Sequence, residues 1–95
     1  MNETIKLSVA ITLNGVQTNQ LTLREPTVGD QLGARRAAGD DQGQFELHML
    51  ASITGCAPQD LHQLSLRDYA RLQKSYLRLV SGDGADEGGI LARSA

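Results

Sequence analysis

The stretch Leu21-Thr-Leu-Arg-Glu-Pro-Thr-Val-Gly-Asp30 changes its periodicity within ten residues, and this change decides the fold. Its first three residues alternate apolar and polar, as a half-buried strand requires. Pro26 favours extended backbone at the residue before it and cannot donate to a strand ladder. Thr27, followed three residues later by Asp30, is typical of a capped helix N-terminus. The stretch therefore predicts a strand that passes directly into a helix.

A second alternating segment precedes this strand. Residues 5–13 alternate without a break, and Asn14-Gly15 is a strong hairpin turn signal before a return strand over residues 16–23. A two-residue loop would place the leucines of the two strands on opposite faces. A three-residue loop with Gly15 in a left-handed bulge would place them on one face. We favour the bulged loop, because a small domain can hardly leave two leucines in water.

The chain after the junction is predicted to be helical as far as about residue 80. Ser65 with Asp68 marks the start of the last helix, which is strongly amphipathic. The second helix is apolar almost all round, so we expect it to be central or to lie at an interface. The predicted helices cover residues 28–38, 44–54, 58 to 62 or 63, and 66 to about 80. The fold class is therefore α+β, an N-terminal β-hairpin followed by three to four α-helices.

A length of 95 residues allows one domain at most. We expect this domain over residues 1–80 and a flexible, acidic, Gly-rich tail over residues 81–95. With one Phe, two Tyr and no Trp, the core must be aliphatic. About 80 residues is near the size at which one core supplies only about 3–5 kcal/mol. A domain of this size often gains stability from a partner or from self-association.

Composition excludes several classes of protein. No apolar run approaches the roughly 20 residues of a membrane span, and the N-terminus has no secretory signal pattern. The lone Cys56 cannot form an internal disulfide, which fits a reducing cytosol. The net charge is −2, and without the acidic tail the body is near neutral. This distribution of charge does not indicate binding to nucleic acid.

No catalytic or metal-binding constellation is present in the sequence. His48, Cys56 and His62 are the imidazole and thiol groups of the chain, and their spacing matches no zinc pattern. No nucleophile triad or phosphate loop is found either. We therefore expect no catalytic, metal or cofactor-binding residues, no cofactor, and a function other than that of an enzyme.

The last helix carries four basic residues in one narrow strip beside its apolar arc. This strip could dock an acidic partner or a phosphate backbone, or it could be a solvated helix face. Four cations without interleaved aromatic residues do not favour nucleic acid. We call these residues the basic strip: Arg67, Arg71, Lys74 and Arg78.

The junction at residues 21–30 resembles the strand-to-helix junction of small tail assembly chaperones of long-tailed bacteriophages, the Mu-like and related families encoded just upstream of the tape-measure gene. The likeness continues in order over residues 5–80, through the apolar helix that ends in Thr54-Gly55 to the final amphipathic helix. The resemblance implies a non-enzymatic factor that binds the tape-measure protein, keeps it soluble and helps recruit tail-tube subunits. It also implies action in the host bacterial cytoplasm and absence from the mature virion.

A tape-measure protein is long and helical, so its chaperone needs aliphatic helical surface. Many weak copies along one client would bind it by avidity. The alternative for any such residue is a place in the core. Our candidates for partner contact, expected at the edges of the apolar arcs, are Leu47, Leu50, Leu72, Tyr76 and Leu79.

Two other hypotheses come from different classes of protein. One is a small phage- or prophage-encoded regulatory protein that inhibits a host protein through the basic strip. The other is a structural protein that associates with itself into rings or filaments.

Overall fold

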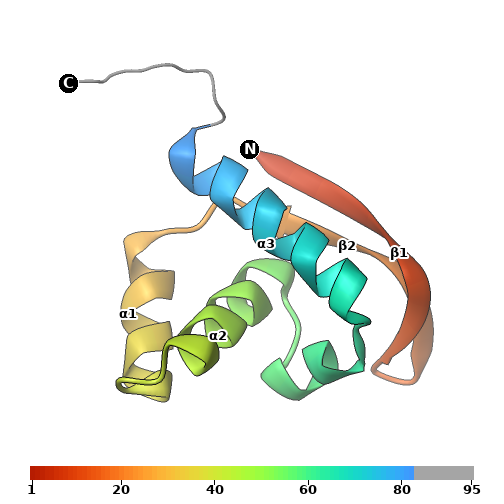
Figure 1. Cartoon of the computed structure of the whole chain (residues 1–95), viewed down its shortest axis with the longest axis horizontal. Helices are drawn as coiled ribbons and strands as arrows, with labels where there is room; N and C mark the ends of the chain where they lie inside the picture. Colours follow the sequence, from red (N-terminus) through yellow and green to blue (C-terminus); the bar gives the residue numbers. More distant parts are fainter. Residues whose placement is uncertain (83–95) are drawn as a thin grey trace.

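The computed structural model describes residues 1–82, and most of the predicted tail lies outside the described residues (Figure 1). An antiparallel two-stranded hairpin is followed by four helices, which confirms the α+β prediction. The elements are β1 (Asn2–Leu13), β2 (Val16–Arg24), α1 (Val28–Ala38), α2 (Gln42–Thr54), the 3₁₀ helix η1 (Pro58–Gln63) and α3 (Leu66–Ser81). No helix within residues 1–82 is long and apolar enough to cross a membrane.

The junction between β2 and α1 forms as predicted. The Thr27 hydroxyl accepts from the Asp30 N–H at 3.2 Å, and the Asp30 carboxylate accepts from the Thr27 N–H at 2.8 Å. This reciprocal capping box satisfies two of the N–H groups that a helix start leaves free. α1 accordingly begins at Val28.

The predicted three-residue hairpin loop is wrong. Leu13 pairs with Val16 across a two-residue turn, with positive φ at both turn residues. The change of register lies inside the strands instead, where residues 7–10 of β1 face Asn19 alone. This odd number of extra residues brings Leu21 opposite Ile5, and both are buried. The leucines thus reach the core by a mid-strand bulge.

Side chains from the helices take the place of a third strand beside β1. The amide of Gln63 bonds both backbone groups of Thr12, accepting from its N–H and donating to its carbonyl, each at 2.9 Å. Further along the strand, Arg71 donates to the carbonyl of Lys6. An open strand edge invites pairing with other chains, and these bonds protect part of the edge of β1.

Asp68 ties the bulge of β1 to the start of α3. Its fully buried carboxylate accepts from the Ser8 N–H at 3.0 Å, the Val9 N–H at 3.3 Å and the Ser8 hydroxyl at 3.0 Å. Its own N–H donates to Ser65, as predicted, but the carboxylate turns to β1 and not back to the helix cap. Burial raises the pKa of Asp68, yet these hydrogen bonds outweigh it and lower the pKa below 3.8.

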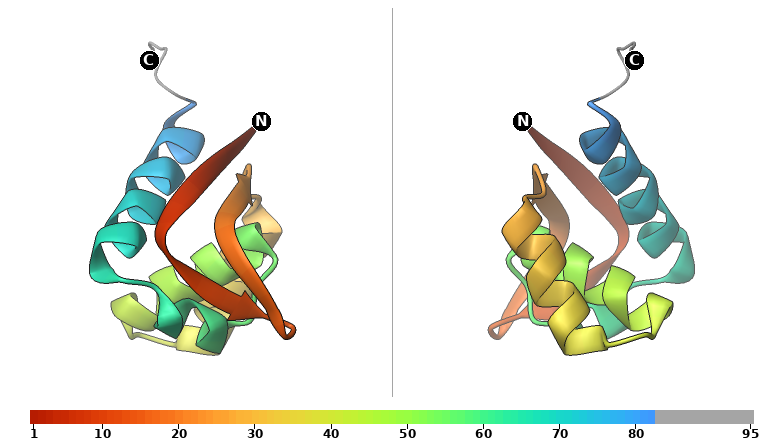
Figure 2. Two further views of the ribbon diagram at one scale, coloured as in Figure 1. Left: turned by 90° about the vertical axis from the view of Figure 1, so that its right-hand side faces the viewer. Right: turned by 90° about the vertical axis from the view of Figure 1, so that its left-hand side faces the viewer.

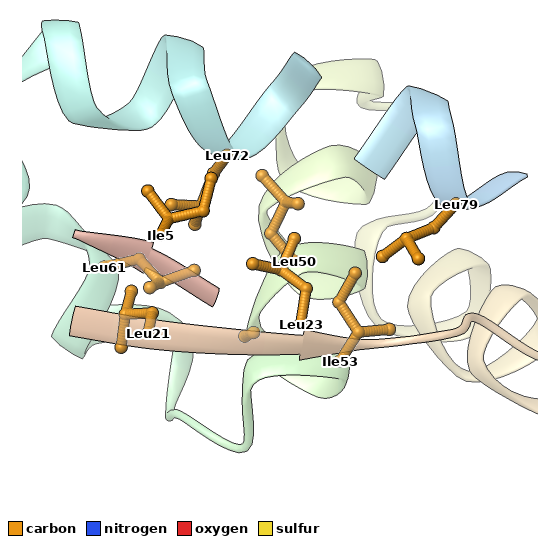
Figure 3. Packing of buried hydrophobic residues seen from close by; sticks show 9 residues of the cluster. Ile5, Leu21, Leu23, Leu50, Ile53, Leu61, Leu72 and Leu79 are labelled. Atoms are coloured by element: carbon orange, nitrogen blue, oxygen red, sulfur yellow. The ribbon is translucent and has the colours of Figure 1, made fainter. Parts of the chain in front are cut away.

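The core lies between the hairpin, α2 and α3 (Figure 3). α2 is central, as its all-round apolar pattern predicts, since it contacts α1, β2, η1 and α3. It begins two residues earlier than predicted, because Asp41 caps it through the N–H of Gln44 at 2.9 Å. α3 lies along β1, whereas α1 packs on α2 away from the hairpin (Figures 1 and 2). The core residues are Ile5, Leu21, Leu23, Leu50, Ala51, Ile53, Leu61, Leu72 and Leu79.

Candidate functional site

A groove of about 250 Å³, with Glu25, Thr27 and Gln31 as the polar part of its lining, lies between the start of α1 and the end of α3. Met49 and Leu79 are buried beneath it, whereas Val28 and Val80 on its rim are 71% and 59% exposed. Glu25 is the one charged residue in its lining, within the part of the chain that the structure describes. We call this feature the α1–α3 groove, with Pro26, Val28, Met49, Tyr76, Leu79 and Val80 as its apolar and aromatic lining.

The exposed apolar surface continues along both helices beyond the groove. Leu32 follows Val28 by four residues on α1, and Leu77 precedes Val80 by three on α3. Residues at these spacings share one helix face. Leu32 and Leu77 are 59% and 63% exposed. Both walls of the groove therefore carry large apolar side chains in water.

The five predicted contact residues fall in different places. Tyr76 and Leu79 line the α1–α3 groove. Leu50 and Leu72 have no exposed surface, and Leu47 is half-buried against the core. The expectation that all five lie at the edges of the apolar arcs is therefore wrong for Leu50 and Leu72, because the hairpin covers the inner faces of α2 and α3. Their contact with a partner stays a prediction, and it requires the core to open.

Sequence reasoning did not select Val28 on the groove rim or Leu32 beyond it. Val28 and Leu32 are the exposed large apolar residues of that helix. Their four-residue spacing was the available signal, but α1 has no wide apolar face and its glycines weaken the helical pattern. The groove also needs the end of α3, about fifty residues further along the chain.

A bidentate ion pair fixes the α1 wall of the groove. Arg24 donates to both carboxylate oxygens of Asp30 at 2.7 Å, and the Ser52 hydroxyl donates to the same carboxylate at 2.8 Å. The Arg24 guanidinium holds the pKa of Asp30 well below its usual range. β2, α1 and α2 are thus joined at one point beside the groove.

Polar contacts between α2 and α3 hold the other wall. Glu46 accepts from the Tyr69 hydroxyl at 3.3 Å and from the Gln73 amide at 2.7 Å. Burial, with a smaller effect from Glu46, raises the pKa of Tyr69 to about 12, and the same two causes raise the pKa of Tyr76. Both tyrosine hydroxyls stay protonated at neutral pH, as an ordinary tyrosine hydroxyl does.

The basic strip is partly engaged with β1. Arg78 donates to Glu3 through two nitrogens, at 2.7 and 3.1 Å, and the buried Ser75 hydroxyl donates to the same carboxylate at 2.7 Å. The Arg78 hydrogen bonds are the main cause that lowers the pKa of Glu3. Arg71 bonds the backbone of β1, as described above. These two arginines thus help to hold the hairpin against α3.

The other two residues of the basic strip are exposed. Lys74 lines a notch of about 310 Å³ with Thr4, Ile5 and the two arginines, and Arg67 lies in the first turn of α3. No observation favours the regulatory hypothesis that was based on this strip. Docking of an acidic partner there stays a prediction.

The imidazole and thiol groups, for which no metal site is expected, lie in different segments of the fold. His48 and Cys56 border a cavity of about 300 Å³ between α1 and α2, and His62 lies on η1. Asp30 and Ser52 in that cavity already bond each other. Within residues 1–82, no three metal-binding side chains come together.

Comparison with protein-family models shows a family for most of the chain. A family model described as "Phage tail assembly chaperone proteins, E, or 41 or 14" matches residues 4–81. The matched range contains most of β1 and every later element of the described structure. No curated protein and no solved structure shows a significant match to the chain.

Proposed function

The chain belongs to the family of phage tail assembly chaperones, and from this premise we propose that it binds a tape-measure protein, keeps it soluble and promotes assembly of the tail tube around it. Family membership carries a role in tail assembly, and the match over residues 4–81 is the observation on which the proposal depends. The identity of the client as the tape-measure protein is the proposed step. The tail-tube protein is a further proposed partner.

We place the client contact in the α1–α3 groove. A long helical client presents apolar side chains along one face, and an amphipathic helix binds by inserting such side chains between two helices. The groove offers an exposed apolar rim at Val28 and Val80 over the buried Leu79. Tyr76 adds aromatic surface to the same lining. The partner contacts predicted for Leu47, Leu50 and Leu72 lie outside this groove, because its lining does not include them.

Each single contact of this kind would be weak. The groove is small, and its rim consists of a few side chains on each helix. Copies that also contact one another on the client would bind it by avidity, because each bound copy raises the effective concentration of the next. We propose that the protein acts in the host cytoplasm and is absent from the mature virion.

Co-expression with a helical fragment of the tape-measure protein tests the proposal. The unmodified chain should increase the soluble fraction of the fragment and co-purify with it. The double variant V28E/V80E should lose most of this effect, since it places two carboxylates on the groove rim without touching the core. V16E is the matched control, because Val16 is 62% exposed but lies beside the hairpin turn.

Three results decide the outcome. If the fragment stays insoluble with the unmodified chain at equal expression, the proposed client is wrong. If V28E/V80E and V16E both behave as the unmodified chain, the client contact lies elsewhere on the surface. If V28E/V80E no longer increases the soluble fraction of the fragment while V16E still does, both the proposed client and the proposed site are supported.

A further inference from the structure

The described chain ends beside the α1–α3 groove. Gly82 closes α3 in a left-handed conformation, two residues after Val80 on the groove rim and three after Leu79 beneath it. The chain after Gly82 therefore starts within one helical turn of the exposed Val80. The hairpin tip and the turn between α1 and α2 both lie at the opposite end of the molecule from the end of α3 (Figure 1).

The sequence after Gly82 contains one apolar pair of the right size. Ile90 and Leu91 are the large apolar residues among the last thirteen. Residues 83–89 separate them from Gly82, and three of these seven are glycine. Seven residues span at most about 25 Å. The pair can therefore return to the groove, and glycines place little restriction on the path.

Charge also matches between this segment and the groove. Arg93 is the single basic residue after Gly82 and follows Leu91 by two positions. Glu25 is the single charged residue in the described lining of the groove. The Glu25 side chain is 63% exposed and contacts the N-terminal ammonium group at 3.3 Å. An arginine that reaches the groove with Ile90 and Leu91 would meet a carboxylate there.

We propose that residues 90–93 occupy the α1–α3 groove of their own chain, with Ile90 and Leu91 against its apolar wall and Arg93 beside Glu25. A short linker gives an effective concentration in the millimolar range, so even a weak contact is substantially populated. The chain then covers its own apolar surface until a client displaces the segment. This consequence for client binding rests on the proposed function, whereas the docking itself does not.

A single tryptophan tests the docking without any client. The chain has no Trp, so L91W introduces a clean fluorescent probe into the full-length protein. Docking predicts a blue-shifted emission that acrylamide quenches poorly. Adding V28E/V80E to L91W should shift the emission back to that of exposed Trp, while adding V16E should not. A85W, within the linker, is the control for an exposed position.

The opposite results overturn the proposal. An L91W emission equal to that of A85W would show that the segment does not dock. A blue shift that survives V28E/V80E would place it elsewhere on the chain. These outcomes do not depend on the proposed client, because the fluorescence experiment contains none.

A second measurement tests the regulatory consequence. I90D/L91D should bind a tape-measure fragment several-fold more tightly than the unmodified chain, and A85D/A95D, which adds the same charge to the same region, should not. Equal affinities would contradict the self-covering role. If I90D/L91D does not bind the fragment at all, the failure belongs to the proposed client, because L91W has already decided the docking.

Discussion

Asp68 stabilises a contact between α3 and β1 in addition to its role at the start of α3. It is fully buried, yet it accepts hydrogen bonds from two backbone N–H groups and one hydroxyl of β1, about sixty residues earlier in the chain. Arg71 lies 3.4 Å from the same carboxylate. A buried carboxylate is stable only with such partners. The N–H groups of the bulge in β1 therefore need Asp68 as an acceptor, and the buried carboxylate of Asp68 needs these N–H groups as donors.

Replacing Asp68 with Asn should destabilise the protein strongly. The amide would place an NH₂ group against one of the N–H donors of Ser8 and Val9 and leave it unpaired in the interior. The expected loss in the free energy of unfolding is about 2–3 kcal/mol. Urea denaturation measures it. D40N is the control, since Asp40 is exposed, and a loss below about 0.5 kcal/mol for D68N would contradict the structural role.

The stability of the protein should also depend on pH through Asp68. Its pKa in the folded protein lies below the ordinary value of 3.8, so the unfolded chain binds the proton more readily. The stabilisation is therefore fully present above pH 4 and is lost as pH falls through the folded pKa. Glu3 and Asp30 act in the same direction. D68N should have a flatter stability profile below pH 4, and parallel profiles would contradict the assignment.

At the scale of single elements, η1 acts as a substitute for a strand. The Gln63 amide forms a donor–acceptor pair with Thr12 as a neighbouring backbone would. Q63A should lower the free energy of unfolding by about 1 kcal/mol, because Thr12 is exposed and water replaces part of the lost bonding. It should also open the edge of β1 to pairing between chains.

Two measurements separate these effects of Q63A. Urea denaturation gives the stability, and light scattering against protein concentration reports association. Q59A is the matched control, since Gln59 is an exposed glutamine on the same short helix. Unchanged stability, with the same scattering as Q59A, would show that the edge of β1 is closed by other means.

Local signals predicted the elements well and their long-range contacts poorly. The capping box at Thr27, the turn signal at Asn14-Gly15 and the glycine after α2 are encoded within a few residues, so the start of α1, the strand ends at the turn and the end of α2 followed from the sequence. The bulge in β1 did not, because its N–H groups are satisfied by Asp68 on α3. The α1–α3 groove escaped prediction for the same reason, since its walls are distant in sequence.

At the scale of the whole molecule, α1 is the least anchored part of the candidate site. It packs chiefly on α2, whereas α2 and α3 also contact the hairpin. One buried residue, Ala34, lies on its inner face. The Arg24–Asp30 pair with Ser52 is therefore a main link between α1 and the body. The position of one groove wall depends on a few polar contacts, so small changes there should alter the groove without unfolding the core.

Arg24→Met should loosen α1 selectively. The methionine keeps an unbranched side chain at the end of β2 but removes the hydrogen bonds that Arg24 donates to Asp30 and Ser52. Because Arg24 is 45% exposed, global stability should fall by only about 0.5–1 kcal/mol. Amide hydrogen exchange in residues 28–38 should accelerate several-fold, while α3 changes little. Arg36→Met, at an exposed position on α1, is the control. Equal acceleration in α1 and α3 would mean that the two helices open together, and α1 would then not be a separately movable wall of the groove.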